Sequence, residues 1–140
     1  MEHTVTTNWR EEEIFDVRVN EHSFIIDGNK QLSTSPKPLL LVSLGGCTGI
    51  DVVDMLKKMR VSFERVDVKV TGHLRDEHPK YYDRIEVLYR ITGTNIDHSK
   101  VERAVTLSKD KYCGVSAMLG KVADIDYRIE YVDPGVNAHE

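Results

Sequence analysis

A long, mostly apolar segment at residues 39–53 constrains the fold of this 140-residue chain more than any other feature. As a helix, it carries apolar side chains around most of its circumference, which is typical of a helix buried inside a protein. A chain of 16.0 kDa has about the commonest size for one domain, and so small a core would struggle to cover such a helix on every side. The pattern therefore predicts a buried central helix and a homodimer in which a second copy of the chain helps to cover it.

The sequence on either side of this segment predicts a single domain, residues 1–140, of mixed α/β class in the order β–α–β–α–β. Alternation of apolar and polar residues indicates strands, and apolar positions three to four residues apart indicate helices. The expected strands are residues 4–9, 13–19, 21–27, 64–75, 82–92 and 124–132. We expect the fourth and fifth strands to form a long antiparallel hairpin.

Three helices are expected. The first covers residues 36–60, with Ser35 as its N-cap and Pro36 in its first position, a combination that suits the start of a helix. The second follows a cap at residues 97–99, and the third, shorter helix carries Cys113. Glycines at 45, 46 and 49 lower the helix propensity of the first helix by about 1 kcal/mol each. They indicate close packing or a kink beside Cys47.

Cys47 and Cys113 are the only cysteines of the chain, and each has a glycine beside it. A pair of thiols can pass through a sulfenic acid to a disulfide, provided that a thiolate forms and is accessible. Cysteine is also a small apolar residue that is often buried without any chemical role. The spacing alone leaves both interpretations open.

The composition narrows the expected partners and location. A net charge of −4 does not suggest the polyanions that strongly basic surfaces attract. The longest apolar run, residues 39–42, is far shorter than a membrane span, and the first residues lack the basic and apolar regions of a secretory signal. We therefore expect a cytoplasmic protein without nucleic-acid or membrane partners, in which two cysteines are free thiols or a transient redox pair.

Motifs for metals and cofactors are not found in the sequence. The six histidines are scattered and stand in no zinc-binding pattern. The glycine-rich residues 45–49 lack the lysine of a phosphate-binding loop. The sequence thus predicts no metal site and no cofactor.

Two segments carry a family resemblance. Residues 35–58, with LGGCT followed by DVV, resemble the first cysteine motif of the OsmC/Ohr family, and residues 104–119, with KYCGVSAML, resemble its second. The strand that ends at residue 93 and the strand at residues 127–131 also resemble the family. The similarity covers nearly the whole chain and is greatest to the branch of YhfA-like proteins.

The resemblance implies an OsmC-like α/β (α+β) fold in an intertwined homodimer, with central cysteine-bearing helices wrapped by antiparallel sheets. It implies an oxidoreductase of the stress response, a thiol-dependent peroxidase that reduces organic hydroperoxides. Cys47 would be the attacking thiol and Cys113 the resolving thiol. An external thiol reductant would then reduce the resulting disulfide.

The chain departs from the family pattern at one point. In the family, an arginine from an N-terminal strand and a glutamate early in the first cysteine helix hold the thiolate and the peroxide. Arg10 is the best match for the arginine, and Arg18 is the second. The glutamate falls at Lys37 or Pro38, where this chain has no acid.

Two functions therefore stay open. The presence of both cysteines favours a two-cysteine peroxidase. The missing glutamate favours an OsmC-fold protein without peroxidase activity that binds a small apolar or thiol ligand at the dimer interface. Asp51, one turn after Cys47, would also disfavour a thiolate if it pointed the same way.

Overall fold

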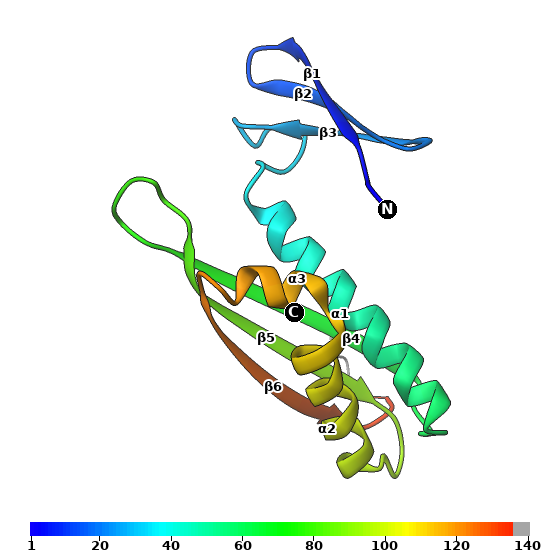
Figure 1. Cartoon of the computed structure of the whole chain (residues 1–140). Coiled ribbons are helices and arrows are strands. Elements are labelled where there is room, and N and C mark those ends of the chain that lie inside the picture. The colour runs from blue at the N-terminus through cyan, green and yellow to red at the C-terminus, as the bar shows by residue number, and fades with distance from the viewer. Residues whose placement is uncertain (136–140) are drawn as a thin grey trace. The chain divides into compact units, whose positions relative to one another are not determined.

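The computed structural model describes residues 1–135, and the chain divides between Leu40 and Leu41 into two compact units (Figure 1). The first unit contains the three strands β1 (Val5–Glu11), β2 (Ile14–Val19) and β3 (His22–Asp27). A long helix, α1 (Pro38–Lys58), follows. The second unit continues with β4 (Arg65–Leu74), β5 (Tyr82–Thr92), α2 (His98–Leu107), the π-helical turn η1 (Ser108–Tyr112), α3 (Gly114–Leu119) and β6 (Asp124–Val132).

The N-terminal unit is an antiparallel sheet in the order β1-β2-β3. Within residues 1–40 only Ile14, Val17 and Asp27 are buried, and all seven residues of β1 are exposed. Asp27 organises the loop after β3, because its carboxylate accepts backbone N–H bonds from residues 29, 31 and 32. A sheet of three strands needs an apolar face packed on something for stability, and this one has little core of its own.

The second unit has two layers, with helices over one face of the sheet β4-β5-β6 (Figure 1). Strands β4 and β5 pair antiparallel, as the sequence predicts, whereas β5 and β6 pair parallel. Parallel neighbours need a crossover connection. Here α2, η1 and α3 supply it, so the segment that carries Cys113 lies over the sheet.

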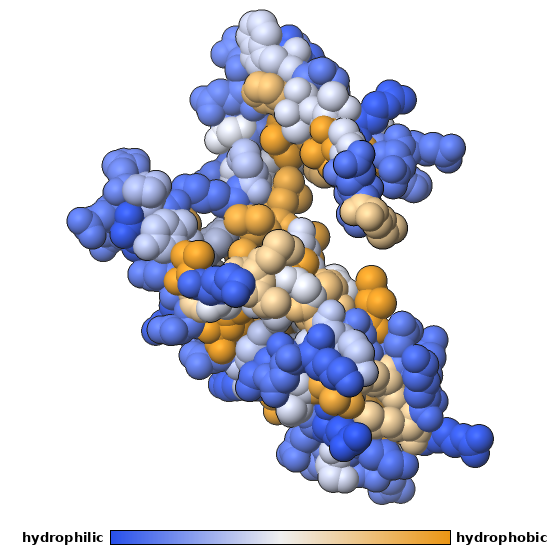
Figure 2. Space-filling model, viewed as in Figure 1, coloured by the Kyte–Doolittle hydropathy of each residue, from blue (hydrophilic) through white to orange (hydrophobic). Residues whose placement is uncertain are grey.

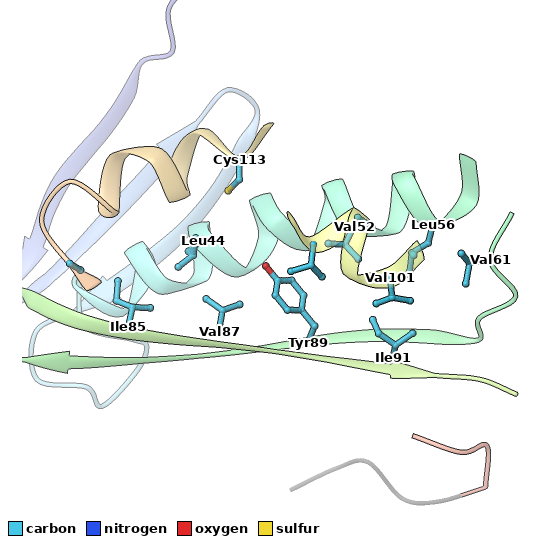
Figure 3. Close-up of a cluster of buried hydrophobic side chains, with 13 residues drawn as sticks. Leu44, Val52, Leu56, Val61, Ile85, Val87, Tyr89, Ile91, Val101 and Cys113 are labelled. Carbon is cyan, nitrogen blue, oxygen red and sulfur yellow. The ribbon is translucent and has the colours of Figure 1, made fainter. Parts of the chain in front are cut away.

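Alternation along β5 builds the core. Ile85, Val87, Tyr89 and Ile91 are each at most 1% exposed and face the helices (Figure 3). On the opposite face of the strand, residues 84 and 86 are exposed, whereas Leu88 is only 9% exposed and Arg90 is half-buried.

Helix α1 is buried along one stripe rather than all round. Its buried residues are four apart: Leu44, Thr48, Val52 and Leu56. Other apolar side chains of this helix, at residues 40, 42 and 50, are 48–66% exposed, and Figure 2 shows apolar patches at the surface. Within one chain α1 is therefore covered along one side only, and the burial of its other side by a second copy stays a prediction.

By length and composition alone, α1 would also be long and apolar enough to cross a membrane, with a mean hydropathy of 1.7. The longest uninterrupted apolar run, residues 39–42, does not reveal this length of apolar helix, because polar and glycine residues interrupt the apolar sequence. Its buried stripe packs on the sheet β4-β5-β6.

Glycines bring α1 close to β4. A Cβ atom at Gly45 would lie 3.2 Å from Val70 Cγ2, and one at Gly49 would lie 3.4 Å from Val68 Cγ2. At Gly46 a Cβ would meet nothing within 4 Å. Close packing beside Cys47 is thus confirmed for two of the three glycines.

Two helix boundaries differ from the sequence prediction. Helix α1 begins at Pro38 rather than Pro36, since a proline disfavours helical geometry in the residue before it. Cys113 is the extended N-cap residue before α3 and not part of a helix. The preceding segment forms a π-turn, which the apolar spacing did not reveal.

A chain of hydroxyl groups ties α1 to the sheet and to the crossover. Thr48 Oγ1 on α1 lies 2.7 Å from Tyr89 Oη on β5 and 2.8 Å from Ser108 Oγ at the start of η1. All three residues are fully buried. Burial raises the pKa of the Tyr89 hydroxyl, so this group stays neutral.

Replacing Thr48 by valine should lower the free energy of unfolding by about 1–3 kcal/mol, because the Tyr89 hydroxyl loses its partner while buried. Chemical denaturation would measure the loss. Thr106→Val, on the exposed side of α2, is the matched control and should change stability by less than about 0.5 kcal/mol. Equal effects of the two substitutions would contradict a role for the hydroxyl chain.

Candidate functional site

The structure brings Cys47 and Cys113 together. Their sulfur atoms lie within 4.8 Å of each other, both as free thiols. Cys47 stands on α1 and is half-buried, whereas Cys113 is only 3% exposed. The two sulfurs thus differ in access.

Local hydrogen bonds fix the position of Cys113. Its backbone N–H donates to the Ser108 carbonyl oxygen at 2.8 Å, closing the π-turn. Its Sγ accepts the N–H of Ser116 at 3.3 Å. The Ser116 hydroxyl lies 2.6 Å from Tyr127 Oη on β6, so the loop is anchored to the sheet. In Figure 3 Cys113 is seen beside α1, above the apolar core.

Burial raises the pKa of the Cys113 thiol, and the neighbouring Cys47 sulfur adds to the effect. The Ser116 N–H acts in the opposite direction, because it favours the thiolate. The net direction is upward, so Cys113 is a protonated thiol at neutral pH.

Asp51 is the third member of the site. It follows Cys47 by four residues on α1, a spacing that places side chains on one face of a helix. One of its carboxylate oxygens lies within 4.8 Å of both sulfurs. Ser108 Oγ donates to Asp51 Oδ2 at 2.9 Å, which joins the carboxylate to the hydroxyl chain that ends at Tyr89. The sequence indicated Asp51 only as a residue that would disfavour a thiolate at Cys47. Neither its position near the Cys113 sulfur nor its hydrogen bond with Ser108 was predicted.

A cavity of about 510 Å³ reaches Asp51 from the surface. Helices α1 and α2 contribute to it, and Tyr112 of η1 lines it as well. Its charged lining residues include Asp54, Lys58 and Arg103. The cavity gives small polar molecules a path to the carboxylate.

The two arginines considered from the sequence lie in the N-terminal unit. Arg10, on β1, donates from Nε to Asp16 Oδ2 at 3.2 Å, and the pair lowers the pKa of that carboxyl. Arg10 and Arg18, the latter on β2, are exposed, and Asp16 is half-buried. An ion pair on the surface contributes little to stability. Its assignment to the thiol site stays a prediction.

Two neighbouring thiols of unequal access, on an α/β scaffold, define a candidate thiol–disulfide site. Residues 28–128 match the family described as OsmC-like protein. The chain is 38% identical over 112 residues to protein YhfA of Escherichia coli, covering 79% of this chain and 84% of that protein. The chain therefore belongs to the OsmC-like family.

Solved structures share the fold. A hypothetical protein from Aquifex aeolicus is 31% identical, with a TM-score of 0.87 over 95% of this chain and 98% of its own. The organic hydroperoxide resistance protein OhrB of Bacillus subtilis has a TM-score of 0.58 and 16% identity, covering 94% of this chain and 98% of its own. At that identity the second comparison supports the fold alone. Both the family resemblance and the OsmC-like fold are thus confirmed.

The unequal environments predict unequal alkylation. In the Cys47→Ser variant, iodoacetamide should modify folded Cys113 at least tenfold more slowly than the same variant unfolded in guanidinium, because the folded thiol is buried and has a raised pKa. The rate for the folded variant should still be rising above pH 9, where that of the unfolded variant levels off. Mass spectrometry of quenched samples measures both rates. Similar rates in the folded and unfolded states would contradict this description of Cys113.

Proposed function

We propose that the protein is a thiol-dependent peroxidase that reduces organic hydroperoxides with Cys47 as the attacking thiol and Cys113 as the resolving thiol. The observation that carries the proposal is the approach of the two sulfurs to within 4.8 Å. Membership of the OsmC-like family supports it, as does the fold shared with proteins named for organic hydroperoxide resistance.

The proposed reaction balances in atoms and electrons with the two cysteines, the hydroperoxide and an external thiol. The Cys47 thiolate attacks one peroxide oxygen, so an S–O bond forms and the O–O bond breaks. The leaving alkoxide takes a proton and departs as an alcohol, and Cys47 is left as a sulfenic acid. The Cys113 sulfur then attacks Cys47, forms the disulfide and releases water. An external thiol reductant supplies the two electrons that restore both thiols.

The geometry suits the second step. A disulfide has an S–S length of about 2.05 Å, so the sulfurs need to close a gap of under about 3 Å. Cys113 is the extended residue between η1 and the short helix α3. A change of its side-chain rotamer, with a small shift of this junction, supplies that movement.

Activation of Cys47 is assigned to Arg10, because a fixed cation favours a thiolate. The Arg10 guanidinium would have to break its hydrogen bonds with Asp16 and bind the Cys47 thiolate and the peroxide instead. Lys37 and Pro38, at the place of the family glutamate, supply no carboxylate to orient it. We therefore expect weaker peroxidase activity than in relatives that have the acid.

The proposed functional unit is a homodimer in the cytoplasm. The supporting observations are the exposed apolar residues of α1 and the nearly coreless N-terminal sheet. A second copy is the partner that the chain itself supplies, and obligate dimers commonly bury more than about 2,000 Å².

A second candidate function is ligand binding without peroxidase activity. A shallow cavity of about 430 Å³ lies along α1 and β4, lined mainly by Gly45, Gly49, Ile50, Val53 and Val68. Its apolar lining and the missing glutamate favour this alternative. Binding of an apolar probe by a protein whose thiols do not react with hydroperoxide would select it.

The peroxidase proposal predicts an asymmetry between cysteine variants. After rapid mixing of the reduced protein with cumene hydroperoxide, the wild type should lose both thiols to a disulfide. Cys113→Ser should lose one thiol and retain a sulfenic acid that dimedone traps, whereas Cys47→Ser should lose none. Thiol counting and mass spectrometry provide the readout. Equal thiol loss in the two variants would overturn both role assignments.

The dimer proposal predicts sedimentation at twice the 16.0 kDa of one chain. Ile50→Asp, on the exposed side of α1, should shift the protein toward monomer, since it places a charge in an apolar interface. Thr106→Asp, on the exposed side of α2, is the control and should leave the dimer intact. A stable wild-type monomer at micromolar concentration would contradict the proposal.

A further inference from the structure

The two cysteines form one cluster with a carboxylate that the proposed disulfide chemistry does not use. The sulfurs of Cys47 and Cys113 and one carboxylate oxygen of Asp51 all lie within 4.8 Å of one another. Cys47 and Asp51 come from successive turns of α1, and Cys113 comes from the crossover between β5 and β6. Three ligand atoms thus converge from two segments that are distant in sequence.

We propose that, when both thiols are reduced, Cys47, Cys113 and Asp51 bind one zinc-type divalent cation in a three-ligand site with an open fourth position. Zinc is bound by thiolate and carboxylate ligands, and three protein ligands leave one position for water or a small molecule. Thiolates select zinc over magnesium or calcium, which prefer oxygen ligands. On binding, each thiol transfers its proton to solvent and its sulfur donates a lone pair to the metal.

The spacing fits such an ion. Tetrahedral zinc with Zn–S distances near 2.3 Å and a Zn–O distance near 2.1 Å holds its ligand atoms about 3.6–3.8 Å apart. The three atoms already lie within 4.8 Å of one another. Adjustments of side-chain torsions by about 1 Å per atom close the remaining difference.

Outer hydrogen bonds hold two of the ligands in place. Ser108 Oγ donates to Asp51 Oδ2 at 2.9 Å, and Ser108 is itself fixed by Thr48 at 2.8 Å. The Ser116 N–H binds the Cys113 sulfur at 3.3 Å. Metal ligands are characteristically oriented by a second layer of this kind, whose loss weakens affinity about 10–100-fold.

The site also has an entry path and a consequence for oxidation. Asp51 is one of the residues that line the cavity of about 510 Å³, and neither cysteine lines it, so a hydrated cation in the cavity meets the carboxylate before the sulfurs. A disulfide offers no thiolate, so metal binding and disulfide formation exclude each other. This last consequence rests on the proposed peroxidase function, whereas the metal site itself does not.

The test is an anaerobic titration of the reduced full-length protein with Co²⁺, followed by displacement with Zn²⁺ in competition with a chromogenic chelator. We expect one Co²⁺ per chain, with a thiolate-to-cobalt charge-transfer band that Zn²⁺ abolishes. The disulfide form should bind none. Cys47→Ser and Cys113→Ser should each weaken the band, and Asp51→Asn should lower the Zn²⁺ affinity at least tenfold.

Asp54→Asn is the matched control, because Asp54 is on the same helix and lines the same cavity but is outside the cluster. It should keep the wild-type affinity. Ser108→Ala should weaken Zn²⁺ binding without removing a ligand, and circular dichroism establishes that each variant is folded. No charge-transfer band in the folded wild type, or equal affinities of the Asp51 and Asp54 variants, would overturn the site.

Failure of the metal site and failure of the peroxidase are distinguishable. The titration contains no peroxide, and thiol counting with cumene hydroperoxide is done in the presence of a chelator. A protein that binds Co²⁺ but does not react with hydroperoxide retains the metal site alone.

Discussion

The hydroxyl chain between Tyr89 and Asp51 is the interaction on which the rest of this structure depends. Its bonds of 2.7, 2.8 and 2.9 Å join the central strand of the sheet, the long helix and the first residue of the π-turn. A buried polar network stabilises a protein only when every member has a partner. Because every hydroxyl in this chain has one, the network fixes how α1 rotates about its axis, and therefore where the Cys47 side chain lies.

The same network joins the fold to the chemistry. The Ser108 carbonyl oxygen accepts the Cys113 N–H and so closes the π-turn. The Ser108 hydroxyl donates to Asp51 and so orients the carboxylate of the site. Glycines at 45 and 49 complete the arrangement, since they let α1 lie close against β4. These glycines lower the helix propensity of α1 at the positions where its backbone lies close to the sheet.

Much of the fold follows from local sequence patterns. All six strands were predicted to within about two residues, because alternation along a half-covered sheet is a strong signal. The convergence of Cys47 and Cys113 was expected only through the family resemblance. The hydrogen bond between Ser108 and Asp51 joins residues 57 positions apart, and no local pattern encodes it. The π-turn and the N-cap position of Cys113 are closed by bonds across five and three residues, but the spacing of apolar residues does not reveal them. The exposed side of α1 could not be distinguished from its buried side either, since both are apolar.

The Cys113 sulfur is the N-cap of α3 as well as the proposed resolving thiol. Its bond from the Ser116 N–H at 3.3 Å begins the first turn of that helix. In the proposed disulfide reaction the sulfur would turn toward Cys47, this bond would lengthen, and the first turn of α3 would lose its cap. The oxidation state of Cys113 would then change the amide hydrogen-exchange rate of Ser116. Hydrogen exchange with solvent at this amide would thus report on the state of a sulfur whose residue is only 3% exposed.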